Sequence, residues 1–262
     1  MTIIITGTSA GIGFTLAEYF GKKGYKVFGL SRKIVESKYF KTIPTDITDN
    51  TQVQNAIAEV LKTESRIDVL INNAGMGMVG AVEDSTQEEI LKLFNLNLVG
   101  SVQMMTGVLP KMREQKMGQI INISSIGSEM GLPFRGFYSA SKSALDKVTE
   151  AIRYEVSPWN IQVCTLHLGD IKTNIAENRV KTKVSEPYQK TFNKVYSLMN
   201  AHVNDGTEPL EVAEYIDQLL AKKSWKAHFY FGKFGQKIGI PLKWILPQNF
   251  YENLMRKYNQ MD

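Results

Sequence analysis

The most constraining feature of this sequence is a regular alternation between short apolar runs and longer amphipathic stretches. The runs, rich in Val, Ile and Leu, have the length of buried strands, and the stretches between them have helical periodicity. Such alternation favours a parallel sheet with helices on both faces. The sequence therefore predicts a doubly wound α/β fold that binds ligands at the carboxyl ends of its strands. The expected strands are residues 3–6, 26–30, 68–72, 119–124 and 161–166, and the expected helices are 11–23, 51–64, 88–109, 139–157 and 212–220.

No repeat, low-complexity tract or flexible linker interrupts the alternation, so we expect a single domain over residues 1–262. A chain of this length, 43% of it apolar, can bury a full core without disulfides or a structural metal. The lone Cys164 excludes a disulfide scaffold and is expected to be a small buried residue of its strand. No basic leader opens the chain and no apolar run reaches about 18 residues, so we expect a cytoplasmic protein.

The positive charge of the chain is concentrated near its end. Lys and Arg number 31 against 26 Asp and Glu, which gives a formal net charge of +5. Six lysines and no acidic residue lie between Lys222 and Lys243. Because the rest of the chain is close to neutral, this pattern does not favour nucleic-acid binding.

A glycine-rich turn stands between the first expected strand and the first expected helix. It reads Thr6-Gly7-Thr8-Ser9-Ala10-Gly11-Ile12-Gly13. Glycine permits positive φ and a close backbone approach to a pyrophosphate, while the following helix points free N–H groups at the anion. A plain Gly-rich turn is the alternative, but the position after an N-terminal strand favours a dinucleotide site. The spacing of the three glycines is wider than in the common fingerprint.

Selectivity between the two nicotinamide dinucleotides is expected where the second strand ends. An NAD-selective site places a carboxylate there for the ribose 2′-hydroxyl, but this sequence has Ser31 and Arg32. A hydroxyl beside a guanidinium suits a 2′-phosphate, which the planar guanidinium can bind bidentately. The sequence therefore predicts NADP (NADPH) in preference to NAD. The alternative, a solvated Arg32–Lys33 pair, stays open, because Ala10 in the glycine turn adds no second basic group.

A tyrosine and a lysine one helical turn apart form the second motif, in the segment Tyr138-Ser139-Ala140-Ser141-Lys142. Their i, i+4 spacing places both side chains on one helix face. A free phenol has a pKa near 10, and a nearby ammonium or oxidised nicotinamide lowers it towards the range useful for proton exchange. Ser125, at the end of an expected strand, is placed to hydrogen-bond a reacting carbonyl. A Tyr and a Lys at this spacing are common on protein surfaces. The pair therefore indicates a catalytic site only in combination with the other motifs.

Together these motifs resemble the short-chain dehydrogenase/reductase family, whose members of this size fold as one Rossmann-like domain. The resemblance covers residues 6–173, about two thirds of the chain. Besides the residues above it rests on Asp46, Asn72-Asn73-Ala74-Gly75 and Asn97, in the order usual for the family. The chain departs from the family in having Leu168-Gly169 where Pro-Gly is common, and a short segment at 32–45, where we expect a helix of only a turn or two.

The resemblance implies a role for each motif residue. Tyr138 is the implied catalytic acid/base, and Ser125 orients the carbonyl or alcohol. Lys142 holds the nicotinamide ribose and lowers the Tyr138 pKa, while Asn97 holds a water of a proton relay. The residues implied to contact the cofactor are Gly7, Ser9, Gly11, Ile12, Gly13, Ser31, Arg32, Asp46, Asn73, Ala74, Gly75, Tyr138, Lys142 and Thr173. No metal is implied, and His167 receives no catalytic role because Tyr138 already fills the proton-transfer position.

The expected substrate is a lipophilic carbonyl compound or secondary alcohol. Residues 130–134 are similar to family members, of the hydroxysteroid and retinol dehydrogenase kind, that act on bulky lipophilic alcohols or ketones. The apolar side chains expected in the pocket, with ordinary core packing as the alternative, are Met76, Met78, Leu132, Phe134 and Phe137. The sequence thus predicts NADP(H)-dependent hydride transfer. One alternative is an NAD-dependent dehydrogenase of hydroxylated lipids. The other is a non-catalytic dinucleotide sensor, against which the intact Ser125–Tyr138–Lys142 set argues.

The second half of the chain carries the remaining expectations. Residues of about 174–205 are expected to form a substrate lid. A C-terminal extension, about 222–262, is expected to add a strand at 225–234, to end in an amphipathic segment at 250–258 and to fold over the substrate mouth. Its Lys, Trp and Phe side chains also suit weak contact with an anionic membrane surface. The family resemblance suggests a homodimer or homotetramer through residues 88–109 and 139–157.

Overall fold

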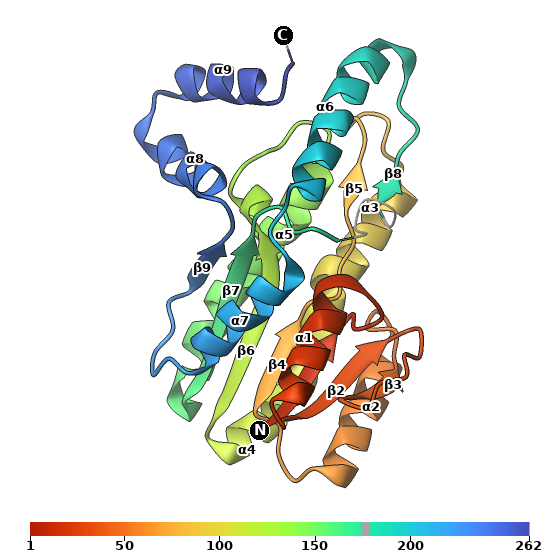
Figure 1. Cartoon of the computed structure of the whole chain (residues 1–262), viewed down its shortest axis with the longest axis vertical. Helices are drawn as coiled ribbons and strands as arrows, with labels where there is room; N and C mark the ends of the chain where they lie inside the picture. The colour runs from red at the N-terminus through yellow and green to blue at the C-terminus, as the bar shows by residue number, and fades with distance from the viewer. Residues whose placement is uncertain (174–178, 262) are drawn as a thin grey trace.

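The computed structural model describes residues 1–173 and 179–261, and within them seven strands form one parallel sheet (Figure 1). Its strand order is β3-β2-β1-β4-β6-β7-β9. The order reverses between β1 and β4, which opens a crevice at the carboxyl ends of these strands. The predicted doubly wound α/β fold is confirmed. The strands are β1 (Thr2–Thr6), β2 (Lys26–Ser31), β3 (Lys41–Pro44), β4 (Val69–Asn72), β6 (Gly118–Ser125), β7 (Ile161–Leu168) and β9 (His228–Phe231).

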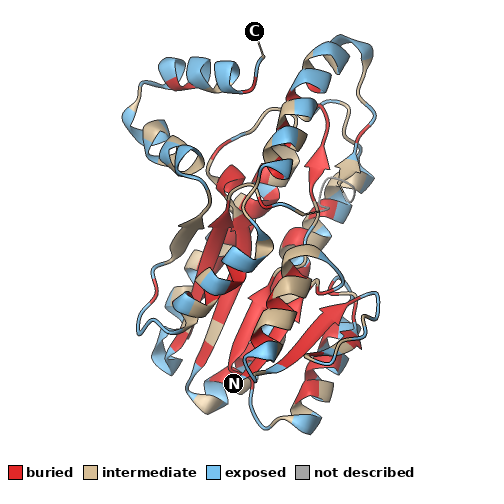
Figure 2. Ribbon diagram, viewed as in Figure 1, coloured by how far each residue is buried: buried red, intermediate tan, exposed pale blue. Residues whose placement is uncertain are grey.

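Helices cover both faces of this sheet (Figure 1). On one face lie α1 (Gly11–Lys22) and α7 (Pro209–Leu220), and on the other α2 (Asn50–Thr63), α4 (Ser101–Gln115) and α5 (Gly136–Val156). Successive strand residues point to opposite faces. In β1, therefore, Ile3 and Ile5 pack in the core beneath α1 and α7, whereas Ile4 packs in the other core. Burial on both faces explains why the central strands are apolar throughout (Figure 2).

The long helix expected at 88–109 is divided. It consists of α3 (Gln87–Phe94), a π-helical turn η1 (Asn95–Gly100) and α4. The sequence expectation ended the helix before Pro110, yet α4 continues to Gln115. Proline removes the N–H that would bond the carbonyl of Thr106, and both residues lie on the exposed side, where water can replace that bond. The π-helical turn carries Asn97, one of the residues predicted for the site.

One local expectation was wrong, and one small element was not predicted. Residues 32–40 contain no helix, and the edge strand β3 follows them directly. The loop is anchored instead by Phe40, which is buried and makes an edge-to-face contact with Phe14 of α1. A small parallel ladder of β5 (Met78–Val79) and β8 (Val180–Lys181), which the sequence did not predict, lies beside the main sheet.

The end of the chain is more helical than the sequence suggested. The strand expected at 225–234 is shorter, as β9, and helices α8 (Phe234–Ile245) and α9 (Gln248–Tyr258) follow it. Both helices stand beyond the carboxyl edge of the sheet and are largely exposed (Figure 2). The expected lid contains α6 (Glu186–Asn204), while its first residues, 174–178, lie outside the described part of the chain. Across the described residues, no helix is long and apolar enough to cross a membrane.

Candidate active site

The glycine turn at the carboxyl end of β1 forms a cradle at the start of α1. Gly7 and Gly11 adopt φ of +75° and +58°, which other residues rarely reach. A Cβ on Gly13 would overlap the carbonyl oxygen of Gly7, so helix α1 can begin this close to β1 only with glycine there. Ala10 precedes α1 without a side-chain cap, and the first turn holds no acidic residue. The N-terminal N–H groups of α1 therefore fit an anionic pyrophosphate.

Residues after β4 hold this turn in place. The amides of Asn73 and Ala74 donate to Thr6 Oγ1, at 3.0 and 2.9 Å. The side chain of Asn73 donates in return to the carbonyl oxygen of Thr6, at 3.0 Å. Thr173, after β7, lies with Cγ2 3.5 Å from where a Cβ of Gly11 would be. The structure thus brings the predicted glycine-turn, Asn73–Gly75 and Thr173 segments to one edge of the sheet.

The residues predicted to select the cofactor lie at the ends of β2 and β3. Ser31 is buried, and its hydroxyl donates to the carbonyl of Lys33 at 2.6 Å. Arg32 is exposed directly after β2. Asp46 follows β3 with its carboxylate accepting from the amide and the hydroxyl of Thr48. Ser31 therefore stabilises the local loop, and Arg32 is the cation that stays available to a ligand.

Ser125 and Tyr138 come together from the end of β6 and the first turn of α5. The Ser125 hydroxyl accepts from the amide of Gly127 at 3.0 Å, which leaves its proton free for another acceptor. Burial raises the pKa of the Tyr138 phenol, while a hydrogen bond with Ser125 and the guanidinium groups of Arg135 and Arg179 lower it. The pair thus places two hydroxyl groups side by side. Burial dominates, so the pKa of the Tyr138 phenol lies above its usual value, and the nearby positive charge offsets part of that increase.

Lys142 and Asn97 lie directly behind this pair. The Lys142 ammonium donates to the carbonyl oxygen of Ile123 at 2.8 Å, and burial lowers its pKa to about 8. Its Nζ and the Asn97 side-chain oxygen lie 3.4 and 3.1 Å from where a Cβ of Gly75 would be. The Asn97 amide bonds both backbone groups of Met76 and the hydroxyl of Ser141. Asn97 therefore joins the segment after β4 to α5, and its part in a proton relay stays a prediction.

An apolar cavity of about 240 Å³ opens from Ser125 and runs between α6, α8 and α9. Among the pocket residues expected from the sequence, Leu132 lines it. Phe134 instead packs edge-to-face against Tyr188 and Phe192 in a separate core cluster, and Met78 is buried in β5. The lining that the sequence missed comes from the three tail and lid helices and includes Val195, Met199, Ile238, Leu242, Tyr251 and Leu254.

Sequence reasoning also missed two charged residues of the site. Arg135 immediately precedes α5, lines the cavity near Tyr138 and leaves its buried Nε without a partner in the described residues. Asp170 lines the same cavity after β7. Arg135 lies three residues before Tyr138, and Asp170 directly follows Leu168-Gly169. Closeness to these motifs was the sequence signal that could have identified both residues.

Comparison with known proteins agrees with this geometry. Residues 1–184 match the family model of the short chain dehydrogenases. The chain belongs to this family and is an oxidoreductase that acts on CH–OH or C=O groups with NAD(P).

Individual relatives extend the likeness over the whole chain. One is the 3-ketodihydrosphingosine reductase of Bacteroides thetaiotaomicron, 36% identical over 97% of this chain and 96% of its own length. A short-chain dehydrogenase from Streptomyces avermitilis superposes with a TM-score of 0.83 at 26% identity, covering 98% of this chain and 97% of that one. The structure of ElxO with NADP bound has a TM-score of 0.72 at 27% identity, covering 87% of this chain and 94% of that one.

Proposed function

We propose that this protein is an NADP(H)-dependent reductase of lipophilic ketones, with Tyr138 as the catalytic acid/base. The observation that carries the proposal is that Ser125, which is hydrogen-bonded to the Tyr138 phenol, lines an apolar cavity. Supporting it, the relative from Bacteroides thetaiotaomicron is named for reduction of a long-chain lipid ketone. The test is NADPH oxidation with ketones of increasing alkyl-chain length, for which kcat/KM should rise with chain length. A preference for short polar ketones would overturn the substrate class.

The chain's own residues have distinct tasks in this reaction. The bound dinucleotide supplies or accepts the hydride. The Ser125 hydroxyl, oriented by the amide of Gly127, donates to the substrate oxygen and holds it beside the Tyr138 phenol. As negative charge develops on that oxygen, Tyr138 gives it a proton, and both hydroxyl groups stabilise the transition state. The Lys142 ammonium binds ribose hydroxyls and favours the phenolate that is left. Oxidation of an alcohol is the reverse sequence.

Replacement of Arg32 with alanine tests the preference for NADPH. Because a charge-assisted hydrogen bond is worth about 1.5–3 kcal/mol, the KM for NADPH should rise roughly 10- to 100-fold while the KM for NADH changes little. Lys33→Ala, at the adjacent exposed position, is the matched control and should leave both constants near wild type. Equal effects of Arg32→Ala on the two dinucleotides would instead support the NAD-dependent alternative.

We also propose that the tail binds weakly to anionic membrane surfaces. Phe234, Ile238 and Ile245 form a stripe along α8, and Phe234 and Ile245 are 76% and 75% exposed. Trp244 beside it is 77% exposed, and three lysines of the acid-free run, Lys233, Lys237 and Lys243, lie in or directly before the helix. Ile238 and Leu254 are both exposed and line the cavity, so this apolar surface continues into the site. A lipid substrate could pass directly from a bilayer surface to Ser125.

Vesicle sedimentation tests this surface. At low salt the protein should pellet with vesicles containing phosphatidylglycerol, and not with phosphatidylcholine vesicles alone, because the lysines need anionic headgroups. Exchange of Trp244 and Ile245 for serine should abolish pelleting. Tyr154→Ser, on an 81% exposed residue of α5, is the matched control and should pellet like the wild type. Absence of wild-type pelleting at low salt would refute the proposal.

We further propose a cytoplasmic location and a homodimer or homotetramer built through α4 and α5. The exposed apolar residues Val99 and Tyr154 lie on or next to these helices and support this arrangement. Analytical ultracentrifugation should show a dimer or tetramer, and a monomer at micromolar concentration would exclude it.

A further inference from the structure

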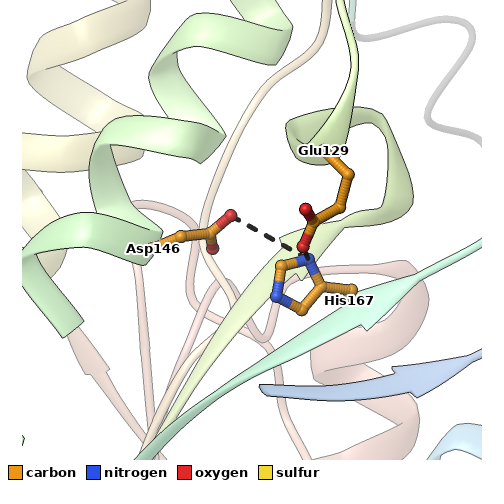
Figure 3. Close-up of side chains that lie close together, drawn as sticks. All are labelled: Glu129, Asp146 and His167. Atoms are coloured by element: carbon orange, nitrogen blue, oxygen red, sulfur yellow. Dashed lines mark ion pairs between the residues drawn. The ribbon is translucent and has the colours of Figure 1, made fainter. Parts of the chain in front are cut away.

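A cluster of ionisable side chains lies behind the catalytic residues, on the side away from the cavity. Glu129 from the short helix η2 (Ile126–Glu129), Asp146 from α5 and His167 from β7 point towards one another (Figure 3). His167 Nδ1 lies 3.7 Å from Glu129 Oε1 and 3.9 Å from Asp146 Oδ2. The imidazole is fully buried and stacks on Tyr230 of β9. Charge in such surroundings is costly unless it is paired.

His167 contacts the backbone of the catalytic serine. Its Nδ1 lies 3.2 Å from the carbonyl oxygen of Ser125 and 3.1 Å from the hydroxyl of Ser128. The Ser128 hydroxyl itself donates to the Ser125 carbonyl, at 2.7 Å. Both partners of Nδ1 therefore act as acceptors, and this hydrogen-bond pattern assigns a proton to Nδ1.

The other ring nitrogen begins a path to the surface. His167 Nε2 lies 3.2 Å from His228 Nδ1, and the Thr165 hydroxyl bonds both nitrogens, at 2.9 and 2.7 Å. His228 Nε2 in turn lies 3.0 Å from Glu150 Oε1, and both side chains are partly exposed. The cluster is thus linked to solvent through polar contacts on β7, β9 and α5.

Asp146 connects this cluster to the catalytic lysine. It follows Lys142 by four residues on α5, so the two side chains lie one above the other on the same face. Burial lowers the pKa of the Lys142 ammonium to about 8, and the Asp146 carboxylate opposes that shift. Burial likewise raises the pKa of Asp146, and the charge of His167 opposes it. Asp146 Oδ1 is buried and has no hydrogen-bond partner among the described residues, which leaves it free to act through its charge.

We propose that Asp146 is a positioning residue that keeps Lys142 protonated, and that the buried His167 imidazole holds the Asp146 carboxylate in place. The buried cluster thereby controls, through Lys142, the acidity of Tyr138. This inference rests on the proposed function only in its last link, from Lys142 to Tyr138. The groups that face the cluster are Glu129 of η2, Lys142, Lys147 and Glu150 of α5, His228 and Tyr230 of β9, and Lys243 of α8.

The chain's own groups already engage two of the three candidate ligand side chains of this cluster, Glu129 and His167. The Tyr230 hydroxyl donates to Glu129 Oε1 at 2.7 Å, and Lys243 donates to the Glu129 carbonyl. With His167 Nδ1 engaged by Ser125 and Ser128, the arrangement suits shared protons better than a cation. Metal analysis of the purified protein should find no stoichiometric ion, and a bound divalent ion at this cluster would overturn the proposal.

The first test is the pH dependence of kcat/KM for NADPH, which reports on the free enzyme. The wild-type rate should fall above about pH 8, as Lys142 loses its proton. Asp146→Asn preserves shape but removes the charge, so the midpoint of this fall should move to lower pH by roughly one unit. His167→Gln keeps a donor for Ser125. Because burial lowers the pKa of His167 and leaves the imidazole uncharged at this pH, this variant should move the midpoint much less than Asp146→Asn.

Glu155→Gln, on the exposed side of α5, is the matched control and should leave the midpoint unchanged. A uniform loss of rate in Asp146→Asn, with the wild-type midpoint retained, would mean that Asp146 is only structural. A shift in His167→Gln as large as that in Asp146→Asn would show that the charge of Asp146 does not set the midpoint.

The second test needs no catalysis. The chain has three histidines, so the imidazole nitrogens can be followed singly by NMR of protein labelled at histidine. Burial lowers the pKa of His167, and the carboxylates of Asp146 and Glu129 oppose that shift. Asp146→Asn should therefore move the His167 titration to lower pH, with His202 as the internal reference. If His167 titrates identically in both proteins, the cluster proposal fails, whereas failure of the enzymatic proposal alone would leave this result intact.

Discussion

Replacement of Tyr138 with phenylalanine is expected to lower kcat by about 10²- to 10⁴-fold, the usual contribution of a positioned general acid. The Tyr138 phenol is hydrogen-bonded to Ser125, which lines the cavity. Phenylalanine keeps the ring and its packing but supplies no proton to the developing alkoxide. The dissociation constant for NADPH, measured by fluorescence titration, should change by less than about threefold, because the glycine cradle is untouched.

Tyr154→Phe is the matched control for this change. Tyr154 lies on the same helix, α5, but is 81% exposed, so its hydroxyl has no access to the site. Activity of this variant should equal that of the wild type. Substantial turnover by Tyr138→Phe would remove Tyr138 from the acid/base role and leave the dinucleotide-sensing alternative as the better interpretation of the fold.

Replacement of Gly13 with alanine is the second change expected to have a large effect. The added Cβ would overlap the Gly7 carbonyl oxygen and the side-chain nitrogen of Asn73, two groups that shape the cradle. Overpacking of this kind costs about 1–3 kcal/mol, which lowers the thermal midpoint by roughly 3–10 °C in a domain of this size. Because the cradle itself is displaced, the dissociation constant for NADPH should rise at least about tenfold.

Gly131→Ala provides the corresponding control. A Cβ at Gly131 would meet no atom within 4 Å, so stability and NADPH affinity should both stay at wild-type values. Differential scanning calorimetry and titration of the same samples separate the two expected effects of Gly13→Ala. Unchanged NADPH affinity in Gly13→Ala would show that the dinucleotide does not use this turn.

Much of the fold was predictable because it depends on local periodicity. Each central strand is buried on both faces and so reads as a continuous apolar run, as at Ile3–Ile5. The glycine turn was equally clear, since positive φ and the close approach of β1 to α1 restrict Gly7 and Gly13 to one residue type. The i, i+4 spacing likewise places Tyr138 and Lys142 on one face of any helix that contains them both.

Other features had no local signal. The helix α4 continues past Pro110 only because that residue and Thr106 face solvent in the folded protein. The apolar cavity draws its lining from α6, α8 and α9, which the chain brings together over more than 60 residues of sequence. Phe134 was expected in the pocket because it lies close to Tyr138 in the sequence. In the structure it packs against Phe192 in a separate core cluster.

The sequence by itself determined the fold class, the phosphate-binding turn and the residues of the proposed catalytic pair, because each depends on neighbours within one or two turns of chain. Only the tertiary structure placed His167 and Asp146 behind Ser125, linked them to His228 and opened the cavity towards the exposed face of α8. Those arrangements depend on strand order. Because β7 lies between β6 and β9, His167 of β7 can contact both Ser125 of β6 and His228 of β9. The order of the strands in the sheet cannot be predicted from the spacing of these residues along the chain.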